Sequence, residues 1–451
     1  MSATRYASVL GLGFGDCGKG HFVDALARRW GAHTVVRCNG GAQAGHNVVT
    51  VADAGVPARH HTFSQFGAGT LAHGVGTILL DPMVVHPTAL LVEANVLGGI
   101  GIHDALSRLK IDARCRVTTP YHQAAGRLRE RLRGAGAHGT CGVGVGETVR
   151  HALQHPDEVL CYADLGFSEA TAMDKLQAIR ETLLTELSPP ASASAEEAVV
   201  EELQALHDET LAARWLNQSR ALVRQSPPAS AEAIRAQMER PGCVLFEGAQ
   251  GVLLDEWRGF HPHTTWSSIS TEAVEDTARR MGIEAPIEHC GVLRSYLTRH
   301  GIGPLPTHDE SLDALLVEPH NSGEGWQGSF RRGHPDAVLL RYALEAVGHL
   351  SGLLISHLDV FDRGVGLKWC ERYLRDSLPE AVCYVERLPL GNHEDLAHQA
   401  MLTDWLRDAQ PEYAEETIDS AAAFLERVAS VTDLPVTFGS YGPTFADVRD
   451  H

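Results

Sequence analysis

Residues 8–20 read SVLGLGFGDCGKG, and this glycine-rich stretch decides how the chain begins to fold. The apolar run from Ala7 to Leu10 is typical of a buried strand, and apolar side chains recur at helical spacing from Phe22 onward. A glycine-rich turn between a strand and a helix lets backbone N–H groups approach phosphate oxygens at the helix N-terminus. We therefore predict a strand–turn–helix unit that binds phosphate.

The spacing of Gly13, Gly18 and Lys19 is close to that of a P-loop, but the next position departs from it. A P-loop places Ser or Thr after the lysine to hold Mg²⁺, whereas this chain has Gly20. If a metal binds, another oxygen must hold it, and Asp16 inside the loop is the first candidate. The structural alternative is a glycine-rich turn that binds no ligand.

The composition is that of a globular protein. The chain has 451 residues, of which 44% are apolar, and no apolar run approaches the length that spans a membrane. Its 57 acidic and 38 basic residues give a net charge of −19, which argues against non-specific binding to nucleic acid or to an anionic membrane. The nine cysteines show no C-x-x-C pair or zinc spacing, and no signal-peptide core precedes the first strand. We therefore expect a cytoplasmic protein with reduced thiols.

Short apolar runs alternate with helical stretches, which predicts an α/β fold with a central, mostly parallel sheet covered by helices. The expected strands include residues 34–36, 76–80, 243–246, 353–356 and 434–439. Helical spacing is found at residues 103–110, 119–133 and 337–347. Residues 168–238, rich in Leu, Ala and Glu, predict a helical excursion with Pro-rich connectors at 188–192 and 226–230, and the polar, glycine-rich residues 320–333 predict a loop.

Six segments together resemble the adenylosuccinate synthetase family, and they occur in that family's order. They are GDCGKG at 15–20, VRCNGGAQAGH at 36–46, GTCGVGVG at 139–146, LFEGAQG at 245–251, TRHGIGP at 298–304 and HLDVFD at 357–362. Because they are spread over nearly the whole chain, the resemblance is far more specific than any one motif. It implies one large domain over residues 1–451, a P-loop-like nucleotide site and a homodimer.

The resemblance also implies a reaction. Members of the family are ligases of purine biosynthesis that join aspartate to the 6-position of IMP with GTP as co-substrate and Mg²⁺ as metal. A base removes the N1 proton, O6 attacks the γ-phosphate of GTP, and the amine then displaces the 6-phosphate. The expected partners are therefore a purine nucleotide and a small amine, and each stage requires charge placed where it develops.

The family's catalytic residues match positions in this sequence. Asp16 matches the base that also ligates Mg²⁺, since a carboxylate is both a hard oxygen ligand and a proton acceptor. Lys19 matches the lysine that neutralises phosphate charge, and His46 matches the general acid beside the phosphoryl oxygens. Gln250 matches the amide that reads the purine near O6, and the carbonyl of Gly45 falls where a second Mg²⁺ ligand is expected. The structural alternatives are turn residues for Asp16 and Gln250, a solvated lysine and a structural histidine.

The nucleotide contacts are carried over in the same way. Asp359 matches the aspartate that accepts the N1 and N2 hydrogens of guanine, although His357 replaces the family's usual lysine two positions earlier. Gly442 and Pro443 resemble the turn that closes over the guanine. The remaining expected contacts to nucleotide phosphates are Gly15, Gly18, Gly20, Thr140, Thr265 or its neighbour Thr264, and Arg150, which the resemblance would place across the dimer interface.

The departures from the family cluster on the side of the amine donor. The family's mobile loop, Thr-Thr-Gly-Arg-x-Arg-Arg, clamps aspartate, whereas residues 326–332 read WQGSFRR. Val143 replaces a second arginine, and Cys141, Gln43 and Cys17 replace further polar residues. Loss of an arginine–carboxylate pair costs roughly 2–5 kcal/mol. The expected donor loop therefore consists of Trp326, Gln327, Ser329, Arg331 and Arg332, with Arg331 as its main cation.

The sequence leaves three functions open. The first is a ligase that activates a purine-nucleotide 6-oxo group but uses another amine or another purine nucleotide, such as a guanine nucleotide. The second is the housekeeping reaction of IMP with aspartate. The third is a non-catalytic nucleotide-binding relative, which the joint presence of Asp16, Lys19 and His46 disfavours. Gly20 disfavours a P-loop switch GTPase.

Overall fold

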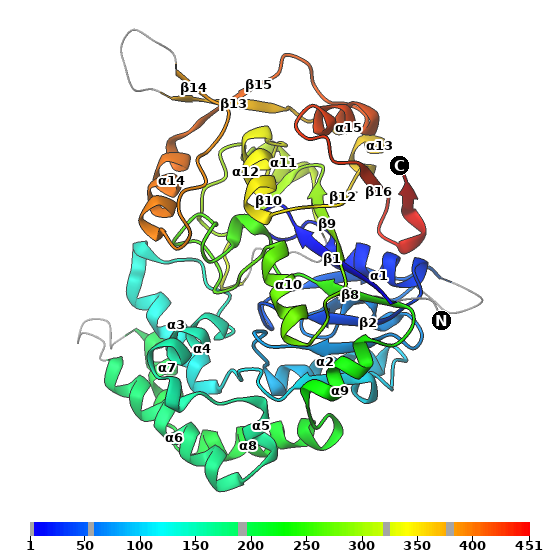
Figure 1. Ribbon diagram of the computed structural model, residues 1–451. Helices are drawn as coiled ribbons and strands as arrows, with labels where there is room; N and C mark the ends of the chain where they lie inside the picture. The colour runs from blue at the N-terminus through cyan, green and yellow to red at the C-terminus, as the bar shows by residue number, and fades with distance from the viewer. Residues whose placement is uncertain (1–3, 53–57, 188–195, 319–324, 376–382) are drawn as a thin grey trace.

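A ten-stranded sheet forms the centre of the protein (Figure 1). The computed structural model describes residues 4–52, 58–187, 196–318, 325–375 and 383–451. The sheet order is β17-β16-β12-β9-β1-β8-β2-β5-β6-β7, and every pairing is parallel except that of the edge strand β17. The strands are β1 (Arg5–Gly11), β2 (Ala32–Arg37), β5 (Gly76–Leu79), β6 (Leu109–Asp112), β7 (Pro228–Ala229), β8 (Cys243–Glu247), β9 (Ile287–Arg294), β12 (Gly352–Ser356), β16 (Val436–Ser440) and β17 (Val448–Asp450). The predicted fold class is confirmed.

The central strands are apolar on both faces because both faces are covered. β8 and β12 are buried along their whole length. Neighbouring side chains of β1 point to opposite faces, so that Leu10 packs in one core and Val9 in the other. Phe246 and Leu245 on β8 divide in the same way. This explains why these strands are continuous apolar runs rather than alternating ones.

Most of the helices cover the sheet or join its strands. They are α1 (Lys19–Arg29), α2 (Pro87–Gly99), α3 (Pro120–Arg133), α4 (Val145–Gln154), α5 (Tyr162–Gly166), α10 (Thr271–Arg280), α11 (Glu310–Leu315), α12 (Ala337–Val347), α13 (Asp359–Asp362), α14 (Leu396–Asp408) and α15 (Ala421–Ala429). α3 and α12 confirm two predicted helices, and Thr119 caps α3 together with His122. None of the helices in the described ranges is long and apolar enough to cross a membrane.

The helix-rich segment contains α6 (Glu169–Glu186), α7 (Glu197–His207), α8 (Thr210–Gln225) and α9 (Ala231–Met238). In Figure 1, α3, α4, α6, α7 and α8 lie together at one end of the molecule, and α3 contacts α6, α7 and α8. The connector predicted at 188–192 lies outside the described residues, whereas the one at 226–230 includes β7.

Two local predictions are wrong. Residues 103–110 form turns, a short 3-10 segment and the start of β6, because Lys110 and Ile111 pair with β5. The loop predicted at 320–333 ends in a strand, β11 (Phe330–Gly333), which pairs with β10 (Leu297–His300), and residues 320–324 lie outside the described ranges. The other small sheets pair β3 (His46–Val49) with β4 (His60–Phe63), and β13 (Cys370–Arg375) with β14 (Cys383–Val385) and β15 (Gln410–Tyr413).

Candidate active site

Loops that follow four adjacent parallel strands meet at one cavity of about 630 Å³. These strands are β9, β1, β8 and β2, and ligands of open α/β sheets bind beyond such carboxyl ends. The five residues expected to act in catalysis or to hold Mg²⁺ line this cavity, namely Asp16, Lys19, Gly45, His46 and Gln250. Segments more than 200 residues apart in sequence are thus brought into one site.

The loop after β1 is held through its carbonyl groups. Arg294 donates from Nη1 to the carbonyl oxygen of Asp16 at 2.7 Å, and Ser356 donates from Oγ to the carbonyl oxygen of Cys17 at 2.7 Å. Gly18 has a φ of +87°, and a Cβ there would lie 3.0 Å from the Cβ of Ser356. Glycine is therefore required at position 18 by both conformation and space.

The Asp16 carboxyl group lies in a partly desolvated place. Burial raises its pKa, while His300, Lys19 and Arg294 oppose that rise. The nearest of these contacts is His300, whose Nε2 lies 3.5 Å from Oδ2 of Asp16. A carboxylate with a raised pKa is a better proton acceptor than one in water, which suits a general base.

Lys19 begins α1 and is nearly completely buried at 3% exposure. Its Nζ lies 3.7 Å from Sγ of Cys17, and within the described residues it forms no ion pair. A buried ammonium group that lines a cavity without a carboxylate partner is suited to an anionic ligand such as phosphate. The expectation of a phosphate-binding lysine agrees with this placement.

His46 is buried and paired with Glu247, the last residue of β8. Nδ1 of His46 lies 2.5 Å from Oε1 of Glu247, and the other oxygen of Glu247 accepts the N–H of Ala68 at 2.9 Å. Burial lowers the pKa of His46 to about 4, against the opposing effect of Glu247. Burial by itself would raise the pKa of Glu247, but His46 and Arg37 outweigh it and bring that pKa below its usual value.

The pair therefore consists of an anionic carboxylate that accepts Nδ1–H and an imidazole whose Nε2 is available to a ligand. A phosphoryl anion at Nε2 would raise the pKa of His46 and let it act as an acid. Glu247 stands in the LFEGAQG motif at 245–251, but no role was assigned to it from the sequence. The feature of the sequence that could have pointed to Glu247 is a carboxylate at the end of a predicted buried strand, directly before a glycine-rich turn.

Gln250 follows β8 in a left-handed conformation with a φ of +52°. Both Oε1 and Nε2 of its amide are buried and have no hydrogen-bond partner in the described part of the chain. Buried amides nearly always have partners, so an unpaired amide on a cavity wall indicates a group that a ligand satisfies. A purine edge with an acceptor and a donor would satisfy it.

Asp16 and Gly45 offer one carboxylate and one backbone carbonyl on the wall of the same cavity. Among the described residues, no group of three or more His, Cys, Asp and Glu side chains could by itself hold a metal ion. Mg²⁺ is commonly held by one or two protein oxygens together with substrate phosphates and water. The residues present therefore fit Mg²⁺ that is held jointly with a nucleotide.

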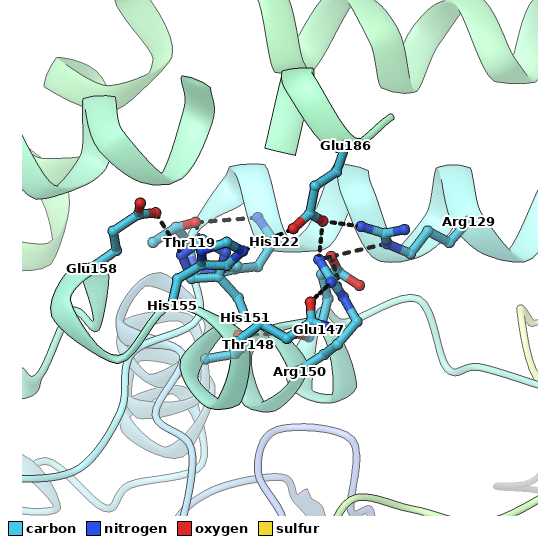
Figure 2. A network of polar contacts seen from close by, with 12 residues as sticks. Thr119, His122, Arg129, Glu147, Thr148, Arg150, His151, His155, Glu158 and Glu186 are labelled. Atoms are coloured by element: carbon cyan, nitrogen blue, oxygen red, sulfur yellow. Dashed lines mark hydrogen bonds and ion pairs between the residues drawn. The ribbon is translucent and has the colours of Figure 1, made fainter. Parts of the chain in front are cut away.

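One wall of the cavity is a network of paired charges between α3, α4 and α6 (Figure 2). Arg150 contacts Glu147 and Glu186, each at 2.6 Å, and Arg129 contacts the same two carboxylates. Thr140 donates its backbone N–H to Glu130 at 3.1 Å and lines the cavity, as does Thr265. The charge of Arg150 is thus compensated by two acidic residues of the same chain.

The residues expected at the guanine lie together but outside the cavity lining. Asp359 begins α13 directly after Leu358, whose N–H donates to the carbonyl of Ser440 at 2.9 Å. Ser440 in turn donates from Oγ to the carbonyl of Gly442, and His21 of α1 lies 3.1 Å from the carbonyl of Pro443. The start of α13 and the turn at 441–443 are thus neighbours beside the N-terminal end of α1.

Comparison with known proteins gives the same assignment along the whole chain. The family model described as adenylosuccinate synthetase matches residues 8–448. The chain is 31% identical to the adenylosuccinate synthetase of Edwardsiella ictaluri (strain 93-146) over 457 residues, which cover 96% of this chain and 95% of that protein. This chain belongs to the adenylosuccinate synthetase family. It is a carbon–nitrogen ligase, and purine biosynthesis and GTP binding follow from the family.

Two solved structures share the fold. The fully ligated adenylosuccinate synthetase from Plasmodium falciparum has a TM-score of 0.77 at 19% identity and covers 99% of this chain and 100% of its own. The cyanophage S-2L succinoaminodeoxyadenylate synthetase, bound to dGMP and dATP, has a TM-score of 0.61 at 13% identity over 100% of this chain and 96% of its own. At these identities the likeness concerns the fold.

The segment that was expected to contact the amine donor, residues 326–332, is held largely by contacts within the protein. The indole of Trp326 packs on Gly142, where a Cβ would lie 2.7 Å from its Cγ, and its ring lies 4.5 Å from Cζ of Arg131 and 5.4 Å from Cζ of Arg127. Gln327 lines the cavity. The Trp326 ring thus ties this loop to α3 through stacking with the protein's own arginines.

Backbone contacts hold the rest of the loop, although the side chain of Ser329 is exposed. Ser329 accepts the N–H of Gly301 through its carbonyl at 3.0 Å. Arg331 donates to the carbonyl of Gly303 at 2.5 Å, and burial lowers its pKa. Arg332 is buried, and its side chain donates to the carbonyl of Phe330 at 3.1 Å. Neither Arg331 nor Arg332 contributes to the cavity lining.

Arg299 is the cation that lines the cavity on this side. It lies opposite Arg331 in the β10–β11 register and is 2% exposed. It donates to the carbonyls of Pro304 at 2.9 Å and His263 at 3.2 Å, and within the described chain it has no carboxylate partner. Burial and Arg331 both lower its pKa. Of Arg299, Arg331 and Arg332, Arg299 is therefore the one whose side chain lines the cavity.

Proposed function

We propose that this ligase uses GTP to phosphorylate a purine nucleotide at O6 and then replaces the phosphate with an amine other than aspartate. The observation that carries the proposal is the meeting of Asp16, Lys19, the His46–Glu247 pair and the unpaired amide of Gln250 in one cavity. A protein that only binds nucleotides needs no such base and acid. The proposal covers IMP as the purine substrate and also other purine nucleotides such as GMP and dGMP.

In the first stage Asp16 accepts the N1 proton of the purine while Gln250 holds the edge of the base near O6. The electron pair released at N1 moves through the ring to O6, which attacks the γ-phosphorus of GTP, and the bond to the β-phosphate oxygen breaks. Lys19 and His46 stabilise the negative charge that spreads over the phosphoryl oxygens. Mg²⁺ held by Asp16 and Gly45 would supply further charge neutralisation at the phosphates.

In the second stage the amine nitrogen attacks C6 and releases one of its protons to water, and inorganic phosphate leaves with the electron pair of the C6–O bond. His46 donates a proton to the leaving phosphate from Nε2. Glu247 keeps Nδ1–H oriented and stabilises the charged imidazole, as the third member of a triad does. Asp359, Gly442 and Pro443 hold the guanine of GTP, and Thr140, Thr265 and the loop glycines hold phosphates.

The proposal of a donor other than aspartate rests on the residues that stand where the family has its aspartate-binding side chains. Trp326 and Gln327 stand where the family has threonines, Ser329 replaces an arginine, and Val143 packs in an apolar cluster with Val84, Val145 and Val149. With Arg331 and Arg332 turned to backbone carbonyls, Arg299 is the described cation on this side of the cavity. One guanidinium holds one carboxylate in bidentate fashion, so a donor with fewer carboxylates than aspartate fits better.

The housekeeping reaction of IMP with aspartate is the second candidate. It is favoured by Arg299, which has no carboxylate partner in the described chain, and by the 31% identity to a curated adenylosuccinate synthetase over nearly the full length. In both cases we propose a single domain that works as a homodimer with Mg²⁺. Arg150 could then reach a partner's nucleotide only by leaving Glu147 and Glu186.

Phosphate release from GTP tests the proposal. The purified protein is given GTP, Mg²⁺, one of IMP, GMP and dGMP, and one of a panel of amines that includes L-aspartate, with Asp16→Ala as the inactive control. We expect release that depends on both purine and amine, with L-aspartate a poor donor. If L-aspartate gives a KM of about 1 mM or less and exceeds every other amine, the housekeeping reaction stands instead. Absence of release with every pair would overturn both.

A further inference from the structure

Asp16 has an unusual backbone conformation that neighbouring residues must stabilise. Its φ is +24°, in a region that residues other than glycine seldom adopt, although Asp tolerates it better than most. Such a conformation persists only where the surroundings determine it. The groups that hold Asp16 therefore bear on the position of the carboxylate.

Arg294, the last residue of β9, holds the main chain. Its Nη1 donates to the carbonyl oxygen of Asp16 at 2.7 Å, while its Nη2 pairs with Glu318 and the hydroxyl of Tyr296. Arg294 is 4% exposed, and its guanidinium lies over the ring of Tyr296 with Cζ 4.2 Å from the centroid. A buried guanidinium that is anchored on two further groups has little freedom, so β9 fixes where the Asp16 backbone lies.

His300, the last residue of β10, contacts the side chain of the same aspartate. Its Nε2 lies 3.5 Å from Oδ2, and its ring packs on Phe330, its partner in the β10–β11 register, with centroids 4.6 Å apart. Its Nδ1 is buried and unpaired in the described part of the chain. Hydrogen bonds of catalytic groups are often long without substrate and shorten in the complex. The contact directs one carboxylate oxygen to His300 and leaves the other for a ligand.

We propose that Arg294 and His300 are positioning residues for Asp16, one for its main chain and one for its carboxylate. The inference rests on the proposed function, in which Asp16 removes the N1 proton. A base displaced by about 1 Å loses on the order of 100-fold in rate. Neither residue was assigned a role from the sequence, because only the fold brings the ends of β9 and β10 to the loop after β1.

Steady-state kinetics of His300→Val and His300→Gln test the carboxylate contact at the cavity wall, with thermal unfolding measured in parallel because the His300 ring packs on Phe330. We expect His300→Val to lower kcat by about 10- to 100-fold with the KM values for GTP and amine nearly unchanged. His300→Gln should recover most of the rate, because its amide N–H can reach Oδ2 of Asp16. An unchanged kcat, or a change confined to the KM of the amine, would overturn the role of His300.

Arg294→Lys tests the main-chain contact, with thermal unfolding measured in parallel because Arg294 is buried. In protein that is folded at the assay temperature, we expect a lower kcat and an unchanged KM for GTP. Normal kcat in folded Arg294→Lys would overturn the positioning role of Arg294. Asp16→Ala separates the proposed function from the positioning inference. Full turnover in Asp16→Ala would refute the proposed base itself. An inactive Asp16→Ala together with normal His300 and Arg294 variants would refute only the positioning.

Discussion

Gly20 lies directly against His46: a Cβ at position 20 would be 2.7 Å from the Cβ of His46 and 3.2 Å from its carbonyl carbon. This contact explains the departure from the P-loop pattern, because Ser or Thr at position 20 would push away the loop that carries the proposed general acid. The hydroxyl ligand of a P-loop and the closely packed His46 cannot occupy the same place. The proposed metal would therefore be held by the carboxylate of Asp16 and the carbonyl of Gly45, which line the cavity.

Replacement of Gly20 by alanine should therefore reduce both stability and turnover. Overpacking of this kind costs about 1–3 kcal/mol of unfolding free energy. Urea unfolding and phosphate release measure the two effects. Gly13→Ala is the matched control in the same loop, since a Cβ at Gly13 meets nothing within 4 Å. Equal behaviour of the two variants would mean that the His46 loop moves aside at no cost.

His46→Asn should lose about 10²- to 10⁴-fold in kcat without unfolding the protein, because a positioned acid–base group contributes that much. Glu247→Gln should lose less, since it weakens the orientation of His46 but keeps the imidazole. His73→Asn, which changes an exposed histidine, serves as control. A loss below tenfold in folded His46→Asn would indicate a structural histidine.

Asp359→Asn should weaken GTP more than ATP, because the carboxylate is expected to accept both the N1 and N2 hydrogens of guanine. Competition between the two nucleotides for the protein measures the change. Asp362→Asn in the same short helix is the control, since Asp362 is exposed. Equal weakening of both nucleotides would show that Asp359 does not read the base.

Protonation of His21 should lower the free energy of unfolding in acid. Its Nδ1 lies 3.1 Å from the carbonyl of Pro443 and its Nε2 lies 3.1 Å from Oγ of Ser440, and burial lowers its pKa to about 4. The unfolded chain binds this proton near pH 6.5, so folding free energy is lost as the pH falls from about 6.5 to about 4. The loss should be on the order of 2 kcal/mol, because the side chain is only half-buried.

Urea unfolding at several pH values checks this expectation. His21→Gln keeps a hydrogen-bonding side chain but cannot titrate, so its stability should vary less between pH 6.5 and pH 4 than that of the wild type. His73→Gln, at an exposed position, should leave the pH dependence as it is. The same slope in wild type and His21→Gln would contradict the expectation.

Local patterns in the sequence determined the elements and the chemistry they carry. The apolar runs at 7–10, 243–246 and 353–356 had to be strands covered on both faces, because a continuous apolar run has no face for water. The glycine-rich loop predicted a phosphate site with Asp16 as a candidate metal ligand, and the resemblance of six motifs to the adenylosuccinate synthetase family pointed to Lys19, His46 and Gln250. The wrong predictions at 103–110 and 330–333 arose where strand pairing with a distant segment outweighed local pattern.

The tertiary structure alone decided which distant groups meet. Glu247 lies 2.5 Å from His46 because β8 and β2 are adjacent, and Arg294 reaches Asp16 because β9 pairs with β1. It also turned Arg331 toward Gly303 and left Arg299 on the cavity wall. Strand order and register are set by long-range packing of many weak contacts, so no local stretch of sequence contains them. The residues proposed to act could be identified from individual motifs, whereas the residues proposed to hold them in place could not.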